Sequence, residues 1–273
     1  MEKELKEYIK RMKEDEKSPS TISQYIRDIR AFAKFTDGNA LSKEMTVKYK
    51  AYLAERYKAG SVNTKIAAVN GFLSFLGRDE LRIKRLRVQK IAFVCEEKEL
   101  THAEYRKLLT AANADSEKLA LLIQTICATG IRVSELKYIN AEAVKSGKAV
   151  IRMKGKVRVV LICGKLKKNL ERYMKKRKVK EGSIFVTKNG KPVDRSNIWK
   201  KLKSLCEKAG VMRSKVFPHN LRHLFARCFY SVSKDIVKLA DVLGHSSINT
   251  TRIYVMSSDN EHMKILERLD LTM

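Results

Sequence analysis

The chain has 273 residues, 44% of them hydrophobic, with 58 Lys and Arg against 30 Asp and Glu, a formal net charge of +28. This length suits one large domain or two ordinary ones, and the apolar content is sufficient for hydrophobic cores. The charge favours a polyanionic partner, because neutralising phosphates releases condensed counterions. Composition alone also allows a generic basic RNA-binding protein.

The cysteines and the apolar stretches indicate the compartment. The 5 cysteines are scattered and form no CxxC pair, which favours reduced thiols over disulfides or a metal cluster. No uninterrupted apolar stretch is long enough to span a bilayer, and the charged N-terminus has no signal-peptide pattern. We therefore expect a cytoplasmic protein with no membrane partner.

The first part of the chain, residues 1–85, is predicted to be a helical domain. Apolar residues recur at helical spacing in three stretches that begin near Ile22, Val47 and Ile66. Ser20 or Thr21 could cap the first of these helices and Ser61 the third.

Residues 86–99 are interpreted as a linker, because strand-like and charged residues mix there before the acidic run at 96–99. Basic residues cluster where this linker begins, at Arg82, Lys84, Arg85, Arg87 and Lys90. A larger basic run follows at 145–180, with 15 Lys and Arg and one acid, Glu171. Such runs are commonly solvent-exposed faces, but two runs with so large an excess of Lys and Arg suggest contact with a polyanion.

The remaining residues, 100–273, are predicted to form a second domain of helices with small hairpins. Thr101 and Glu104 have the spacing of a capping box. Two strands, 149–153 and 157–162, flank a tip at 154–156, and Asn189-Gly190 signals a second turn. Helices are expected over 100–140, 196–209, 219–231 and 234–243, with one more carrying Tyr254. The fold class is therefore mainly α with small antiparallel β hairpins, in two domains.

Five residues in three short runs have the chemistry for attack on a phosphodiester. They are Arg132, His219, Arg222, His245 and Tyr254. The pentavalent transition state gathers negative charge, which the planar fork of arginine binds through two oxygens at once. The phenol of Tyr254 offers a nucleophile, and a lysine or histidine can protonate the departing oxygen.

Each run is weak evidence when taken singly. A tyrosine in a late helix, for example, commonly packs in the core. Their joint occurrence on a chain this basic favours chemistry on DNA. In these runs the chain resembles the tyrosine recombinases, or phage integrase family, and most of all its two-domain Xer-like members. The resemblance is most specific in residues 129–136, 218–226 and 243–255, and residues 18–80 resemble the family's helical, SAM-like core-binding domain.

The resemblance implies roles for individual residues. Arg132 and Arg222 would clamp the scissile phosphate, His219 would assist proton transfer and His245 would donate a hydrogen bond to the phosphate. Tyr254 would form a 3′-phosphotyrosyl bond and free a 5′ hydroxyl. Glu135 matches a position that supports the site.

The family's general-acid lysine, which lies on a hairpin tip, is matched best by Lys154. The tip reads MKGKVR and is one residue shorter than the usual pattern, which leaves Lys156 as a competitor. DNA contacts are expected from the residues that flank the linker and the tip: Arg82, Lys84, Arg85, Arg87, Lys156 and Arg158.

The resemblance also implies the partners. We expect double-stranded DNA with specific recombination sites, a homo-tetramer on paired sites, a monomer or dimer when free, and association with a prokaryotic nucleoid. Residues 261–269 carry an apolar stripe that would dock either on a neighbouring protomer or on its own domain. The residues suggest no cofactor and no metal, since no glycine-rich phosphate loop is present and no acidic cluster offers a Mg²⁺ site.

Three alternatives remain open at this point. A type IB topoisomerase-like enzyme would share the chemistry but would relax DNA as a monomer. A non-catalytic DNA-binding regulator would keep the catalytic shell without its activity. An RNA-binding protein would bind without covalent capture, although no RNA-recognition signature appears.

Overall fold

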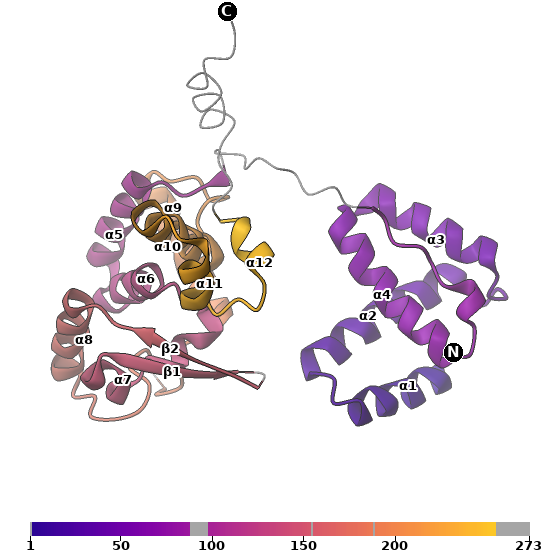
Figure 1. The fold of residues 1–273 in the computed structure, drawn as a ribbon, viewed down its shortest axis with the longest axis horizontal. Helices are drawn as coiled ribbons and strands as arrows, with labels where there is room; N and C mark the ends of the chain where they lie inside the picture. The colour runs from indigo at the N-terminus through magenta and orange to yellow at the C-terminus, as the bar shows by residue number, and fades with distance from the viewer. Residues whose placement is uncertain (1, 88–97, 154, 188, 255–273) are drawn as a thin grey trace, which may run out of the picture. The chain divides into compact units, whose positions relative to one another are not determined.

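The computed structural model describes residues 2–87, 98–153, 155–187 and 189–254. The chain divides into two compact units, residues 1–90 and 91–273 (Figure 1). Each unit has a hydrophobic core of its own. The prediction of a mainly helical chain with a small antiparallel sheet is confirmed.

The N-terminal unit is a helical bundle with α4 at its centre. One face of α4 packs on α2 and α3 through residues such as Phe32, Tyr49 and Ile66, and another packs Phe72 against Tyr8 of α1. Its elements are α1 (Glu2–Glu14), α2 (Pro19–Thr36), α3 (Lys43–Arg56), α4 (Ala59–Phe75) and the short 3₁₀ helix η1 (Asp79–Leu81).

Two predicted helix caps in this unit are wrong. The α2 helix begins at Pro19, whose fixed φ suits the first helical position, so Ser18 is the cap and accepts a hydrogen bond from the Thr21 amide. The α4 helix begins at Ala59, which places Ser61 inside the first turn, where its amide donates to the Lys58 carbonyl. The predicted capping box of Thr101 and Glu104 in the second unit is confirmed.

The second unit is built around α6, which buries 8 of its 13 residues. The α5 and α10 helices pack on α6, and α9 packs on α5. Its elements are α5 (His102–Asp115), α6 (Glu117–Thr129), η3 (Val133–Tyr138), α7 (Ala141–Ser146), β1 (Lys148–Met153), β2 (Lys156–Leu161), α8 (Gly164–Arg177), α9 (Arg195–Ala209), α10 (Pro218–Ser233), α11 (Ile236–Leu243) and α12 (Ile248–Arg252).

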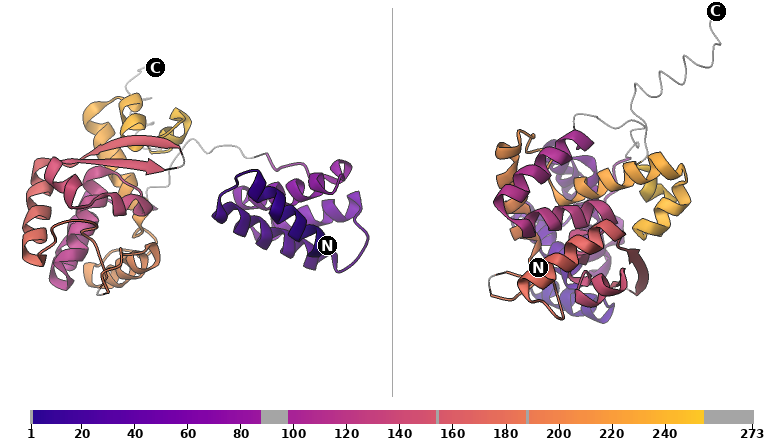
Figure 2. Two further views of the ribbon diagram at one scale, coloured as in Figure 1. Left: turned by 90° about the horizontal axis from the view of Figure 1, so that it is seen from below. Right: turned by 90° about the vertical axis from the view of Figure 1, so that its left-hand side faces the viewer.

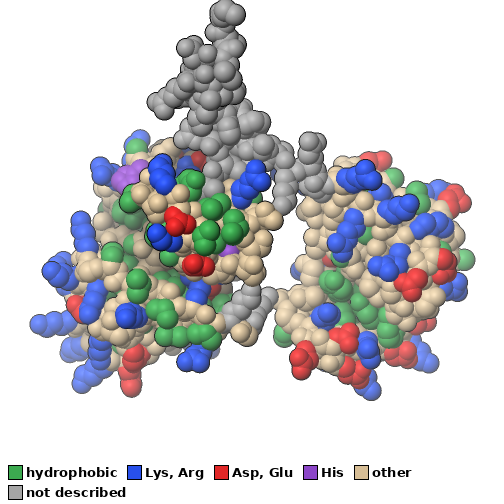
Figure 3. Space-filling view, viewed as in Figure 1, with side chains coloured by type: hydrophobic (Ala, Val, Ile, Leu, Met, Phe, Trp, Pro, Cys, Tyr) green, Lys and Arg blue, Asp and Glu red, His purple; other side chains and the backbone are tan. Residues whose placement is uncertain are grey.

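The β1–β2 hairpin is antiparallel, with Ile151 opposite Arg158. Ala149 and Ile151 face the core, while Val157 and Val159 are exposed, as the alternation of a half-buried strand requires. Figure 2 shows this hairpin on the same side of the unit as α11 and α12. The basic run at 145–180 passes through the hairpin and then along the outer face of α8, where Lys and Arg side chains gather (Figure 3).

Among the described residues, no regular strands flank the turn predicted at Asn189-Gly190. Pairing there is a single bridge between Val186 and Pro192. Two backbone hydrogen bonds flank this bridge, one from the Thr187 amide to the Lys191 carbonyl and one from the Val193 amide to the Phe185 carbonyl. None of the described helices has the length and apolar character that crossing a bilayer requires.

Candidate active site

Arg222 joins three segments of the second unit in the interior. It lies on α10 and is only 1% exposed. Its Nη1 donates to the Gly130 carbonyl at 2.5 Å, and its Nη2 donates to the Leu243 carbonyl at 2.8 Å. Gly130 and Leu243 lie where α6 and α11 end, so one side chain fixes both helix termini beside α10.

The charge of Arg222 has no carboxylate partner among the hydrogen bonds and ion pairs of the described residues. Burial, together with the nearby charge of Arg132, lowers its pKa to about 10, and interaction with the Tyr254 side chain opposes that shift. The guanidinium therefore stays protonated at neutral pH. A buried cation without a counter-ion is costly, and an anion that enters beside it removes the cost.

Arg132 is oriented by Glu135, three residues later. The carboxylate of Glu135 is buried and accepts from the Arg132 amide at 2.7 Å and from its Nη1 at 3.0 Å. The first of these bonds is half of a capping box at the start of η3, which explains the spacing of the two residues. The Arg132 side chain remains 43% exposed, so its free guanidinium edge can reach a ligand.

Arg158 completes this network from strand β2. Its Nη2 donates to Glu135 at 2.5 Å and its Nη1 to the Val242 carbonyl at 2.6 Å. Burial tends to raise the pKa of Glu135, but the Arg132 amide and the charges of Arg158 and Arg132 outweigh it and lower that pKa. We expected Arg158 to contact DNA, but its side chain is 13% exposed and its guanidinium is engaged within the protein.

Three histidine rings gather around Tyr254. Its ring centroid lies 4.4 Å from that of His223, 5.6 Å from that of His245 and 6.0 Å from that of His219. Tyr254 itself is 4% exposed and packs with Leu239 and Leu243 of α11. The structure therefore places the tyrosine beside both predicted histidines and beside Arg222.

The three histidines are held in their neutral form. Burial lowers the pKa of each, and the neighbouring arginines add to the effect; the pKa values of His223 and His245 fall to about 4. His245 is hydrogen-bonded on both sides, with Nε2 at 3.0 Å from Arg222 Nη2 and Nδ1 at 2.8 Å from Thr251 Oγ1. Neutral imidazoles can accept a proton, as attack by a phenol requires.

An open cleft of about 850 Å³ lies beside this region and reaches His245 and Arg132. It lies between the hairpin and the loop after α11, and residues that line it include Arg132, Met153, Arg158 and His245. Gly244 lines one side of this cleft. Its φ is +65°, and a Cβ at this position would lie 2.4 Å from Arg158 Cδ. Two positive side chains and a histidine thus face a space that a phosphate backbone could enter.

The lysine of the hairpin tip is not decided by the structure. Lys154 lies outside the described residues, and of Lys156 only the backbone is described. The choice between them as general acid stays a prediction. Gly155, between them, has a φ of +72°, which suits a tight turn at the tip.

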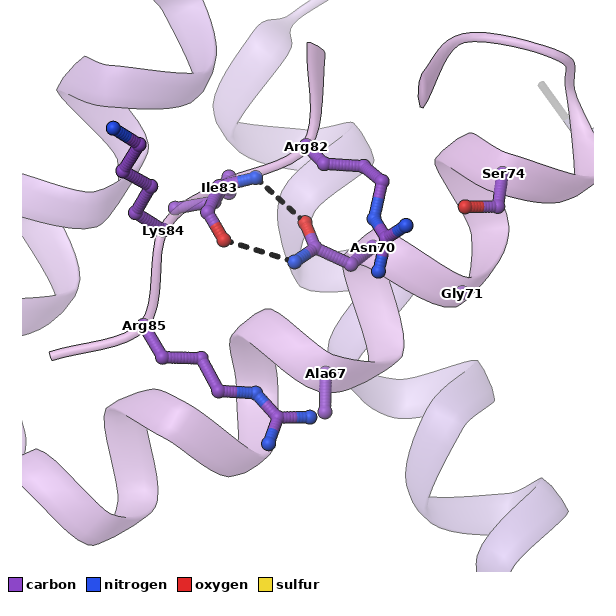
Figure 4. Close-up of a pocket in the computed structure, with 8 residues that line it drawn as sticks. All are labelled: Ala67, Asn70, Gly71, Ser74, Arg82, Ile83, Lys84 and Arg85. Atoms are coloured by element: carbon purple, nitrogen blue, oxygen red, sulfur yellow. Dashed lines mark hydrogen bonds between the residues drawn. The ribbon is translucent and has the colours of Figure 1, made fainter. Parts of the chain in front are cut away.

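The basic residues Arg82, Lys84, Arg85 and Arg87 are exposed on the N-terminal unit. Their segment is held against α4 by asparagine side chains that imitate strand pairing. Asn70 exchanges two hydrogen bonds with the backbone of Ile83, at 2.8 and 2.9 Å (Figure 4). Asn63, two helical turns earlier, does the same with Leu86. The segment is therefore fixed in an extended form that presents its cations to solvent.

The sequence located the arginines, the tyrosine and two of the histidines, but it missed two participants. No role was predicted for His223, yet of the three histidine rings it is the one nearest to Tyr254. Its i+4 spacing from His219 was the available signal, because such residues share a helix face. Thr251 had no signal, since its contact with His245 depends on how α12 folds back.

No group of three or more His, Cys, Asp or Glu side chains suited to a metal ion occurs in the part of the chain that the structure describes.

Comparison with known proteins agrees with this geometry. The model of the phage integrase family matches residues 98–261, and that of the phage integrase N-terminal SAM-like domain matches residues 5–80. The tyrosine recombinase XerA of Pyrococcus horikoshii is 30% identical over 98% of this chain and 93% of its own length. A crystal structure of XerA recombinase, 25% identical, aligns over 100% of this chain and 99% of that one with a TM-score of 0.56.

A structure of the XerH site-specific recombinase bound to its difH substrate, in a pre-cleavage complex, aligns over 92% of this chain and 80% of that one. Its TM-score is 0.70 at 21% identity, so it supports the fold alone. The family models, the XerA likeness and the gathered site together show that this chain belongs to the phage integrase family, as a Xer-like tyrosine recombinase.

Proposed function

We propose that this protein cuts and rejoins DNA at specific sites through a covalent bond between Tyr254 and the 3′ phosphate. The observation that carries the proposal is the buried guanidinium of Arg222, which has no carboxylate partner among the described residues and interacts with both Tyr254 and His245. A phosphate placed there would meet a cation and a nucleophile together. The DNA-bound XerH structure supports DNA as the source of that phosphate.

The chemistry balances without a cofactor. The phenol oxygen of Tyr254 bonds to phosphorus, its proton passes to His219, and the bond from phosphorus to the 5′ oxygen breaks. Lys154 or Lys156 protonates that oxygen. Arg132 and Arg222 hold the non-bridging oxygens while charge accumulates. A 5′ hydroxyl later attacks the phosphotyrosine and reseals a strand, so the energy of the broken bond is conserved.

The neutral form of His219 suits this part. Burial, followed by the charges of Arg222, Arg132 and Arg195, keeps the ring neutral at physiological pH, so it can take the phenol proton. Because Tyr254 is buried in this structure, we propose that DNA binding shifts α12 and exposes the phenol.

The test is covalent capture on nicked DNA. Fragments of genomic DNA that form adducts are mapped first, and a nicked duplex with the mapped site is then used as a suicide substrate. The wild-type protein should form a protein–DNA adduct, while Tyr254→Phe should bind the same duplex and form none. An adduct that survives Tyr254→Phe would refute the assignment of the nucleophile.

The same substrates separate the alternatives. Relaxation of supercoiled plasmid without a defined site would favour a type IB topoisomerase-like activity. Binding without any adduct would favour a non-catalytic regulator.

We further propose a homo-tetramer on paired sites, because exchange between two duplexes requires several active sites at once. Residues 261–269, the predicted docking segment, lie outside the described residues. Deletion of residues 260–273 should abolish tetramers on paired sites while single-site binding persists, as measured by native mass spectrometry. Tetramers that persist after deletion would contradict the role of this segment.

A further inference from the structure

The proton on the His245 ring can be located from its neighbours. Nε2 lies 3.0 Å from Arg222 Nη2, and a guanidinium nitrogen can only donate. Nε2 must therefore be the accepting nitrogen. The proton of the neutral ring is then on Nδ1, which donates to Thr251 Oγ1 at 2.8 Å. The surrounding hydrogen bonds thus select one tautomer in the DNA-free protein.

A second proton on His245 is disfavoured by burial and by the titratable groups around the ring. Arg222 and His219 face it from α10, Arg158 faces it from β2, Arg132 faces it from the start of η3, and Tyr254 stacks on it. Burial and these cations lower the pKa of the ring to about 4. At neutral pH the ring therefore cannot gain a donor on Nε2 simply by taking up another proton.

The proposed role of His245 nevertheless requires an N–H directed at the phosphate. The nitrogen near Arg222 is Nε2, so donation from that side needs the other neutral tautomer, with the proton on Nε2. One proton leaves Nδ1 for solvent and another arrives at Nε2, and the ring stays uncharged. The unprotonated Nδ1 then needs a hydrogen-bond donor. Its neighbour Thr251 is 0% exposed, so that donor has to come from the protein.

We propose that Thr251 is a positioning residue that holds His245 in its Nδ1–H form in the free protein and supports the Nε2–H form once a phosphate occupies the site. A hydroxyl can accept from Nδ1–H or, after rotation, donate to the bare Nδ1. The phosphate accepts from Arg222 in place of Nε2, which frees Nε2 to carry the proton. The same residue also anchors the nucleophile, because its carbonyl accepts from the Tyr254 amide at 2.9 Å. The second half of this proposal rests on the proposed function.

Histidine ¹⁵N spectroscopy reads the tautomer directly, and the chain has only 5 histidines to assign. In the free protein we expect the proton of His245 on Nδ1. In Tyr254→Phe protein bound to an uncut duplex with the mapped cleavage site, we expect it on Nε2. A proton on Nε2 in the free protein, or the same tautomer in both states, would overturn the proposal.

Variants test the hydroxyl itself. Thr251→Val can neither accept nor donate, so we expect adduct formation to slow roughly tenfold while the Kd for DNA changes less than about twofold. Thr251→Ser should restore the rate and the tautomer change. Thr250→Val, one position earlier and exposed, is the matched control and should keep the wild-type tautomers. Thr251→Val that cleaves at the wild-type rate would refute the idea.

The outcomes for the two proposals are separable. The spectrum of the free protein is recorded without DNA, so it tests the Nδ1–H assignment even if the chain never forms an adduct. Binding without cleavage would reject the proposed function alone. If Thr251→Val does not fold, Thr251→Ser and the wild-type spectra still decide the question.

Discussion

Replacing Glu135 with glutamine removes the negative charge between Arg132 and Arg158 and keeps the shape of the side chain. The carboxylate accepts from the Arg132 amide, Arg132 Nη1 and Arg158 Nη2, and it is 2% exposed. The amide of glutamine would offer one oxygen and turn its NH₂ group toward donors. We therefore expect both lower stability and a displaced Arg132.

The size of the loss can be worked out from these contacts. Breaking a buried ion pair by removing one partner costs about 3–5 kcal/mol. Half of the network is screened, because the Arg132 side chain is 43% exposed, and exposed pairs contribute at most about 1 kcal/mol. The Arg158 side of the network is buried and dominates. We estimate a loss of about 2–3 kcal/mol in the free energy of unfolding, or about 4–12 °C in Tm for a unit of this size.

The loss should depend on pH in a defined direction. The pKa of Glu135 in the folded protein lies below its ordinary value of 4.5. Its stabilisation is therefore fully present above pH 4.5 and disappears as the pH falls through the folded value. The difference between wild type and Glu135→Gln should be greatest at neutral pH and should shrink below about pH 4.5.

Urea denaturation followed by tryptophan fluorescence measures this cleanly. The chain has 1 tryptophan, Trp199 on α9, so the signal reports only on the second unit. Glu171→Gln is the matched control, since its ion pair with Lys167 is long, at 3.8 Å, and exposed. A Glu135→Gln protein within about 0.5 kcal/mol of wild type at pH 7 would refute the reasoning. An equal deficit at low pH would do so as well.

Three further predictions follow from single contacts. Gly244→Ala places a Cβ 2.4 Å from Arg158 Cδ at a φ of +65° and should lower stability by about 1–3 kcal/mol more than Gly182→Ala, where φ is +71° and the space is open, in the same urea assay. Arg222→Lys should slow adduct formation at least roughly a hundredfold with little change in DNA affinity, because an ammonium cannot make the forked contacts to Gly130, Leu243 and phosphate. Asn70→Leu releases the basic segment, so the dependence of DNA affinity on salt, measured by anisotropy, should become shallower than in wild type or in the exposed control Asn39→Leu.

The reactive groups could be identified from the sequence because residues that act together lie within one helical turn of each other. His219 and Arg222 share one face of α10, Glu135 reaches back to Arg132 within one turn, and Gly130 and Gly244 end helices beside them. Short-range geometry of this kind follows from helix periodicity and caps. The β1–β2 hairpin and the helices α9, α10 and α11 could be predicted for the same reason, whereas α7 and α8 were not predicted and α12 ends at Arg252, before Tyr254.

The tertiary structure decided which charges meet. Arg158 was expected to contact DNA, but its partners, Glu135 and the Val242 carbonyl, lie 23 and 84 residues away. Thr251 reaches His245 only because the chain after Gly244 turns back through α12. Local sequence determines which backbone conformations are low in free energy. Burial then selects among long-range pairings, since a buried charge or imidazole is tolerated only where distant segments supply its hydrogen-bond partners.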